Sequence, residues 1–322
     1  MPYTDPDISP TIADNSKVEK ILKRYKEAQS LKDNWKEKFE EAYEYCLPQR
    51  ESFYEESPAQ RRTDKIFDET AVVGIQEFAS RLQSGIVPTF ARWANLEAGV
   101  EIPEENVESV NQSLDAITQF VFETVGNSNF NQEVHECFMD LAVGTGCLLV
   151  EDGDAVNPIK FSAIPLPHLI LANGPDNKID TVFRRRYCKL KEVEIMYPQA
   201  KVPEDIMQSM GPDKKCTLLD GVYRIYDEPN VEKYKHCVVL LEKKVIVLEE
   251  FFEGVGSNPY IVFRWNKASG EVYGRGPVFN AMSAIKTCNL TIQLILENAQ
   301  MSISGIYQIE DDGIVNPDNI QL

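Results

Sequence analysis

The stretch Gly144-Thr145-Gly146-Cys147-Leu148-Leu149-Val150-Glu151 decides the fold, because the sequence pattern changes within it. Before this stretch, apolar residues recur at steps of three and four over long segments, which is typical of amphipathic helices. After it come short runs rich in β-branched and aromatic residues, separated by turn-forming groups such as Asp152-Gly153-Asp154. The chain is therefore predicted to be an α+β protein, with a largely helical part at residues 1–145 and a β-rich part at residues 146–265.

The helical part is predicted to hold four helices. The first is a long amphipathic helix ended by Pro48, and the second is stopped by Pro88, since proline breaks a helix interior. Thr63 or Asp64 can cap the second helix and so marks its expected start. The polar residues 49–62 between these two helices are expected to form a mobile loop. The four helices are predicted at residues 16–47, 63–85, 104–126 and 128–143.

The β-rich part is predicted to form a mostly antiparallel, twisted sheet of short strands. Two small helices, Lys189 to Tyr197 and Pro203 to Met210, are expected to interrupt it. The strands are predicted at residues 147–151, 159–164, 169–171, 181–190, 222–226, 236–241, 244–249 and 260–265.

A long final helix is predicted from Pro277 to Met301, because proline is tolerated in the first turn of a helix. One narrow stripe of this helix is polar and nearly all the rest is apolar, whereas a solitary surface helix has a narrower apolar face. The pattern fits a wall element packed between neighbours in a ring, and equally a central helix of a monomeric bundle. The stripe consists of Lys286, Asn289, Gln293, Glu297 and Gln300.

The net charge of the chain argues against a protein that binds nucleic acid tightly. Its 322 residues include 51 acidic and 33 basic side chains, for a formal net charge of -18. Tight binding to a phosphate backbone requires an excess of positive charge. The negative sign suits a wall past which DNA slides without sticking, although solubility alone also explains it.

Seven cysteines are widely spread and show no C-x-x-C spacing, which predicts reduced, mostly buried thiols in a cytosol-like compartment. The polar, proline-broken start of the chain does not resemble a secretory signal, and no apolar run approaches the length of a membrane span.

The motifs that mark common enzyme classes are missing. The three histidines, His135, His168 and His236, do not form an H-E-x-x-H pattern, and no P-loop or G-x-S-x-G sequence occurs. Asp152-Gly153-Asp154 resembles part of a calcium loop but lacks the ligands that should follow. We therefore predict no catalytic residues, no metal site and no cofactor.

The densest run of positive charge is Arg184-Arg185-Arg186, in a predicted strand. Strand alternation places Arg184 and Arg186 on one face and Arg185 on the other. The pair is a candidate contact for an acidic partner subunit or DNA. A solvated strand face with salt bridges is the simpler interpretation.

Three blocks, in order along the chain, resemble the head-to-tail connecting (portal) family of short-tailed phages. The third block is the most distinctive and leads into the final helix. Ala94 departs from the family pattern, which has an aromatic residue there. The blocks are Asp68-Glu69-Thr70-Ala71 with Ser84-Gly85-Ile86-Val87-Pro88 and Trp93-Ala94-Asn95-Leu96, then Gly144 to Val150 with Ile164-Pro165-Leu166-Pro167, then Trp265 with Gly270-Glu271-Val272-Tyr273-Gly274-Arg275-Gly276-Pro277.

The resemblance implies a homo-oligomeric, dodecameric ring at the head–tail junction of the virion, assembled in the host cytoplasm. Residues 1–265 would form the wing, 266–301 a hinge and the first stem helix, and 302–322 the start of the clip. Family chains continue beyond this point, so the resemblance covers their N-terminal part. The implied partners are capsid and scaffolding proteins, terminase, tail adaptor or nozzle proteins, and double-stranded DNA that passes through the channel non-specifically, with no membrane.

The segment around Arg275 is interpreted as a hinge. Arg275 is expected to connect the stem to the wing through bidentate hydrogen bonds to a carboxylate. An ordinary glycine-rich turn with a solvent-facing arginine is the alternative. For the whole chain, two other functions stay open, which are a head–tail adaptor without a DNA channel and an unrecognised hydrolase.

Overall fold

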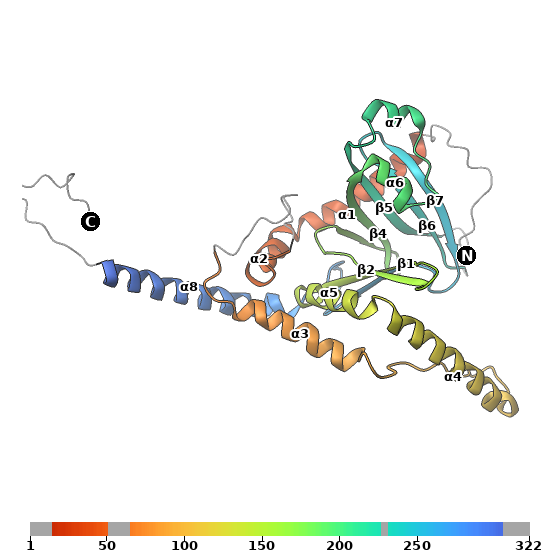
Figure 1. The fold of residues 1–322 in the computed structure, drawn as a ribbon, viewed down its shortest axis with the longest axis horizontal. Coiled ribbons are helices and arrows are strands. Elements are labelled where there is room, and N and C mark those ends of the chain that lie inside the picture. The colour runs from red at the N-terminus through yellow and green to blue at the C-terminus, as the bar shows by residue number, and fades with distance from the viewer. Residues whose placement is uncertain (1–14, 51–64, 227–230, 305–322) are drawn as a thin grey trace, which may run out of the picture.

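A computed structural model describes residues 15–50, 65–226 and 231–304. The β-strands form a central body, with α1, α6 and α7 packed on it (Figure 1). Helix α8 extends from one side of this body and α4 extends toward the opposite side. The predicted α+β class is confirmed.

The helices largely follow the predicted ones. Those at residues 104–126, 128–143 and 277–301 are confirmed to within three residues at each end. The small helices near residues 190 and 204 are also present, the first as a 3-10 turn at Leu190–Glu192 that continues into α6. The α-helices are α1 (Asn15–Asp33), α2 (Lys36–Cys46), α3 (Thr70–Ile86), α4 (Glu104–Asn127), α5 (Phe130–Val143), α6 (Val193–Met196), α7 (Glu204–Met210) and α8 (Pro277–Ser304).

The prediction of one helix over residues 16–47 is wrong, because the chain breaks between Asp33 and Lys36. The apolar face of α1 packs on the five-stranded sheet, whereas that of α2 packs in the core near the start of α8. A single straight helix could not face both partners. The break at Trp35 turns the chain from one to the other.

Helix α3, which was predicted to start at Thr63 or Asp64, begins several residues later, at Thr70. Asp68 precedes it and accepts hydrogen bonds from the backbone N–H and the hydroxyl of Thr70. The predicted loop at residues 49–62 and the predicted cap at Thr63 or Asp64 lie almost entirely in the segment 51–64, outside the described residues.

All eight predicted strands are present, although β5 begins seven residues before its predicted start at Val222, and they form two antiparallel sheets and not one. The three-stranded sheet has the order β2-β1-β8 and the five-stranded sheet the order β3-β4-β5-β6-β7. Pro165 and Pro167 lie between β2 and β3, and because they have no N–H they cannot continue a ladder. The strands are β1 (Thr145–Asp152), β2 (Ile159–Ala163), β3 (Leu169–Asn173), β4 (Ile179–Lys189), β5 (Lys215–Ile225), β6 (Lys233–Leu240), β7 (Val245–Glu253) and β8 (Tyr260–Arg264).

The five-stranded sheet is covered on both faces. Helix α1 buries Val18, Ile21 and Ala28 against one face. Helices α6 and α7 cover part of the other face. The largest apolar cluster lies where α2, α5, both sheets and the start of α8 meet, so α8 begins in the core of the protein. Six of the seven cysteines are buried, and Cys288 on α8 is exposed.

Candidate functional site: helix α8 and its anchorage

Helix α8 leaves the body soon after it begins (Figure 1). Its 28 residues span about 42 Å at 1.5 Å per residue. Its buried residues, Val278, Met282 and Asn289, all lie in its first half. An exposed apolar surface of this extent marks an interaction site. From Leu290 onward, the exposed apolar residues are Leu290, Ile292, Leu294, Ile295, Leu296, Met301 and Ile303.

The first two residues of the predicted polar stripe face the protein's own helical part. Lys286 pairs with Glu41 of α2. Asn289 is only 7% exposed, and its side chain forms hydrogen bonds with the backbone of the segment that leads into α3. Its Oδ1 accepts from the backbone N–H groups of Phe67 (2.7 Å) and Asp68 (3.1 Å), and its Nδ2 donates to the Lys65 carbonyl (3.0 Å).

The outer three residues of the stripe stay at the surface. Gln293 donates through Nε2 to Glu297 Oε1 at 2.8 Å, one turn further along. Gln300 is also exposed, and its backbone carbonyl accepts from the Ser304 hydroxyl. The structure therefore divides the stripe into an inner pair that anchors α8 and an outer trio that lies at the surface.

Three glycines let the loop before α8 lie directly on the end of α5 and the start of β1. A Cβ on Gly274 would come 2.2 Å from the Gly144 carbonyl oxygen, and one on Gly276 2.0 Å from that of Ala142. Gly144 itself has a φ of +150°. The backbone N–H of Gly276 donates to the Val143 carbonyl at 2.9 Å. Side chains at these positions would separate α8 from the body.

Tyr273 holds the same loop from the side of the five-stranded sheet. Its ring is fully buried and packs edge-on against Phe39 of α2, with ring centroids 5.5 Å apart. Its hydroxyl accepts from the backbone N–H of Leu171 at 3.1 Å. The root of α8 is thus joined to α2, α5 and both sheets.

Arg275 lies at the surface of this root. Its Nε and Nη2 donate to the two carboxylate oxygens of Glu271, at 2.9 and 2.5 Å, and these bonds hold the pKa of Glu271 below its ordinary value. Glu271 belongs to the same loop. The contact that reaches the helical part is Trp35, whose ring lies 5.3 Å from the guanidinium carbon.

The predicted alternation along β4 is confirmed, because Arg185 lies on the face opposite to Arg186. Arg185 donates to the Tyr25 hydroxyl (2.7 Å) and to Gln29 (2.9 Å), both on α1. Arg186 donates to the Tyr197 hydroxyl at 3.2 Å. Arg184 is half-buried, and one of its buried guanidinium nitrogens has no hydrogen-bond partner among the described residues.

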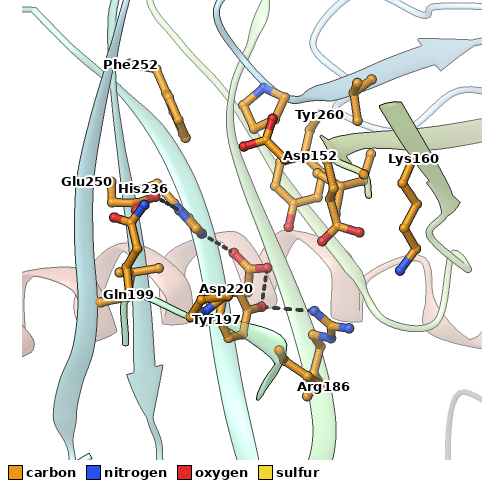
Figure 2. Close-up of a pocket in the computed structure, with 18 of the residues that line it drawn as sticks. Asp152, Lys160, Arg186, Tyr197, Gln199, Asp220, His236, Glu250, Phe252 and Tyr260 are labelled. Carbon is orange, nitrogen blue, oxygen red and sulfur yellow. Dashed lines mark hydrogen bonds and ion pairs between the residues drawn. The ribbon is translucent and has the colours of Figure 1, made fainter. Parts of the chain in front are cut away.

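Arg186 lines a cavity of about 680 Å³ between the two sheets (Figure 2). A chain of polar contacts crosses its wall. The Tyr197 hydroxyl donates to Asp220 (2.8 Å), and His236 bridges Asp220 (2.9 Å) and Glu250 (3.2 Å). Burial lowers the pKa of His236, but the Asp220 charge and the two hydrogen bonds outweigh burial and raise this pKa to about 9.

His236 is therefore an imidazolium at neutral pH, and Asp220, whose pKa is lowered to about 2 despite its burial, is a carboxylate. A protonated histidine between two carboxylates cannot act as a general base. The arrangement stabilises the packing of β5, β6 and β7. Of these residues, the sequence placed only His236 in a predicted strand, and it could not bring the group together because the strand register was unknown.

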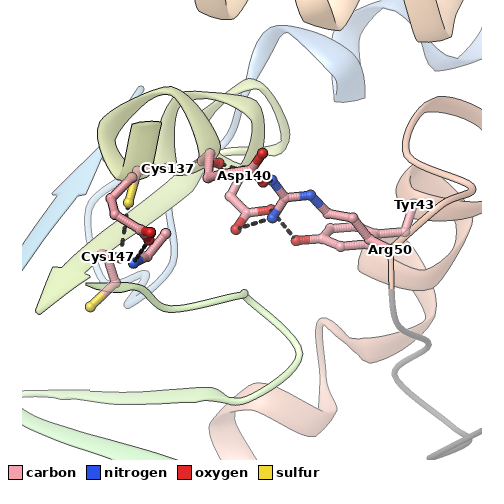
Figure 3. Close-up of polar contacts among 8 residues, drawn as sticks. Tyr43, Arg50, Cys137, Asp140 and Cys147 are labelled. Atoms are coloured by element: carbon pink, nitrogen blue, oxygen red, sulfur yellow. Dashed lines mark hydrogen bonds and ion pairs between the residues drawn. The ribbon is translucent and has the colours of Figure 1, made fainter. Parts of the chain in front are cut away.

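A second buried network joins α2 to α5 (Figure 3). Asp140 is 1% exposed and accepts from the Tyr43 hydroxyl (2.5 Å) and from Arg50 Nη1, which lies 3.0 Å from each carboxylate oxygen. Arg50 also donates to the Glu136 carbonyl at 3.1 Å. This network fixes the end of α2 beside the root of α8.

Within residues 15–50, 65–226 and 231–304, no group of three or more His, Cys, Asp or Glu side chains is arranged to hold a metal ion. Every helix in those same ranges is too short or too polar to cross a membrane.

Comparison with protein families gives a match over most of the chain. The model of the family described as bacteriophage head to tail connecting protein matches residues 18–322, which is nearly the whole chain. A search of curated proteins gave no match.

Proposed function

Because the chain belongs to the bacteriophage head to tail connecting protein family, a structural family of the virion, we propose that it is a portal subunit. Copies of it would form a dodecameric ring, through whose channel double-stranded DNA is packaged and ejected. The single observation that carries this proposal is the exposed part of α8 from Leu290 onward, which has two apolar faces with the polar edge of Gln293, Glu297 and Gln300 between them.

The two apolar sides follow from helical geometry. Residues three and four apart lie on the same face of a helix, so Leu290 and Leu294 share one face, whereas Ile292 and Leu296 share another. Between these faces lies the polar edge of Gln293, Glu297 and Gln300. A wall helix in a closed ring has a neighbour on each side and one edge toward the channel, and this pattern supplies all three surfaces.

The channel edge suits DNA that must keep moving. It offers two neutral amides and one carboxylate per subunit, and the chain as a whole carries a net charge of -18. Phosphates find few cations with which to form long-lived contacts, so passing DNA would be bound weakly and without sequence preference.

We propose that residues 1–265 are the wing, 266–301 the hinge and first stem helix, and 302–322 the start of a clip that meets terminase and the tail adaptor or nozzle proteins. Capsid and scaffolding proteins would contact the wing, and the ring would assemble in the host cytoplasm. Arg275, Lys286 and Asn289 would hold the stem to the wing.

The experiment is electron microscopy and native mass spectrometry of the purified full-length protein. We expect closed rings whose mass is a twelve-fold multiple of the subunit, with a central channel. A small oligomer of low symmetry from the full-length protein would contradict the proposal and favour an adaptor without a channel.

A further inference from the structure

Two neighbouring strands of the five-stranded sheet carry cysteines directly opposite each other. Cys188 of β4 and Cys216 of β5 are partners in the antiparallel register, and their sulfur atoms lie 3.7 Å apart. Residues opposite each other in an antiparallel pair have Cα atoms about 4.5–5.5 Å apart. A disulfide requires a Cα separation of about 4.4–6.8 Å. The backbone is therefore already within range of a disulfide, and only the two side chains have to rotate.

The two cysteines bracket the part of the chain that leaves the sheet between β4 and β5. We name residues 190–214, which include α6 and α7, the cap segment. It covers part of one face of the sheet (Figure 1), and its Leu190 and Val193 belong to the same buried apolar cluster as both cysteines. A bond between Cys188 and Cys216 would close the cap segment into a covalent ring at its base.

The two thiols differ in their access to solvent. Cys188 is 8% exposed and Cys216 is 2% exposed. Burial raises the pKa of both thiols, that of Cys216 to about 12. Since the thiolate is the reactive form of cysteine, both react slowly at neutral pH. Burial thus limits the rate of oxidation, whereas the short distance between the sulfurs decides which product forms.

We propose that Cys188 and Cys216 are a redox-sensitive pair, which a peroxide converts from two thiols into a disulfide. The sulfur of Cys188, the more exposed of the two, attacks one oxygen of hydrogen peroxide; the O–O bond breaks, water leaves and a sulfenic acid forms. The sulfur of Cys216 then attacks the Cys188 sulfur, and the S–O bond breaks with loss of a second water. In total, two thiols are oxidised and one hydrogen peroxide is reduced to two water molecules.

The disulfide would act on the stability of this part of the protein. In a reducing compartment the pair remains as two thiols. Where a peroxide is present, the new bond would hold the ends of the cap segment together even in the unfolded chain and so reduce its conformational entropy. Such a bond lowers the equilibrium constant of unfolding by roughly 100-fold. The inference concerns a single subunit and does not depend on the proposed ring.

The test treats the purified full-length protein with hydrogen peroxide, removes the excess with catalase and blocks the remaining thiols with iodoacetamide under denaturing conditions. Peptide mass mapping should find Cys188 linked to Cys216, with the linked pair lighter than the two thiol peptides by two hydrogen atoms. Dithiothreitol should reverse the link. Urea unfolding of the oxidised protein should give an equilibrium constant about 100-fold lower than that of the reduced protein.

Variants separate the two steps. Cys216→Ser should leave a sulfenic acid at Cys188, which dimedone traps, and should abolish the gain in stability on oxidation. Cys288→Ser is the matched control, because Cys288 is exposed on α8 and is not needed for the link. If Cys216→Ser does not fold, the reversal by dithiothreitol in the unsubstituted protein still tests the effect on stability.

Two outcomes would overturn the inference. One is a folded protein in which Cys188 is linked to a cysteine other than Cys216. The other is the absence of the link in a sample whose exposed Cys288 has been fully oxidised, because peroxide has then reached the protein without joining the pair.

Discussion

Gly144 and Gly274 lie backbone against backbone, so closely that a Cβ on either residue would come 2.2 Å from the carbonyl oxygen of the other. Gly144 ends α5 and Gly274 precedes α8. Thr145 reinforces the contact, because its hydroxyl accepts from the backbone N–H of Gly274 at 2.9 Å. The place where the sequence changes from helix to strand is thus also the place where α8 is joined to the body.

Gly274→Ala should be strongly destabilising, because the Gly144 carbonyl on one side and the Arg264 Cβ on the other leave no room for a methyl group. We expect the free energy of unfolding to fall by about 3 kcal/mol, the upper part of the range for overpacking. Urea unfolding followed by circular dichroism measures this change. The control is Gly85→Ala on α3, where a Cβ would meet nothing within 4 Å, and this substitution should stabilise by about 0.5–1 kcal/mol. A Gly274→Ala protein as stable as the control would contradict the close packing.

Asn289→Ala should release the segment that leads into α3. The substitution removes one donor and one acceptor that together serve Lys65, Phe67 and Asp68, and we expect a loss of about 2 kcal/mol. Hydrogen exchange is the direct measurement, because the amides of Phe67 and Asp68 should exchange faster while those of β4 do not change. Gln293→Ala, on the exposed part of the same helix, should leave both amides protected.

Local pattern was enough to predict the strands and most helices, because alternation and helical periodicity are properties of neighbouring residues. It also placed Arg185 on the opposite face of β4 from Arg186. It could not predict the break at Trp35, since the apolar periodicity continues through it and only tertiary packing separates α1 from α2. The division into two sheets also depends on which strands pair.

The functional-site residues also separate into those that the sequence identified and those whose contacts depend on tertiary structure. The sequence identified the α8 stripe, but it did not show that Asn289 binds the backbone before α3, a contact that spans more than 220 residues. Asp220 and His236 are 16 residues apart and meet because of the register of β5 and β6.

His236 should make stability depend on pH. Its pKa in the folded protein is raised from 6.5 to about 9, so its contribution is fully present below pH 6.5 and is lost as the pH rises through 9. A shift of two to three pKa units corresponds to about 3 kcal/mol in the free energy of unfolding. Lys32 acts in the opposite direction. Burial lowers its pKa from 10.5 to about 7, so its contribution to the stability of the folded protein rises as the pH rises between these two values.

The measurement is therefore a difference between two proteins, in which the contribution of Lys32 cancels. Urea unfolding of the unsubstituted protein and of His236→Gln at pH 6, 7.5 and 9 should show a gap that is largest at pH 6 and shrinks by pH 9. A gap that does not change with pH would show that His236 is neutral in the folded protein.

The two apolar faces of α8 should each be required for the ring. Leu294→Lys and Ile292→Lys place a charge on opposite sides of the exposed half of the helix, where a closed ring would bury it against a neighbour. Each should abolish rings in electron micrographs. Each should change the unfolding free energy of the single subunit by no more than about 0.5 kcal/mol, as is usual at exposed positions.

Gln293→Lys is the matched control, because it adds the same side chain to the polar edge between these two faces. If that edge faces the channel, this variant should still form rings, and each ring should carry an added circle of positive charge. It should then retain double-stranded DNA more strongly, with an affinity that falls steeply as salt rises, since the added lysines displace counterions from phosphates. Filter binding at several salt concentrations measures this effect. Rings lost in Gln293→Lys but kept in Leu294→Lys would mean that the polar edge is the contact between subunits and that the apolar faces are not.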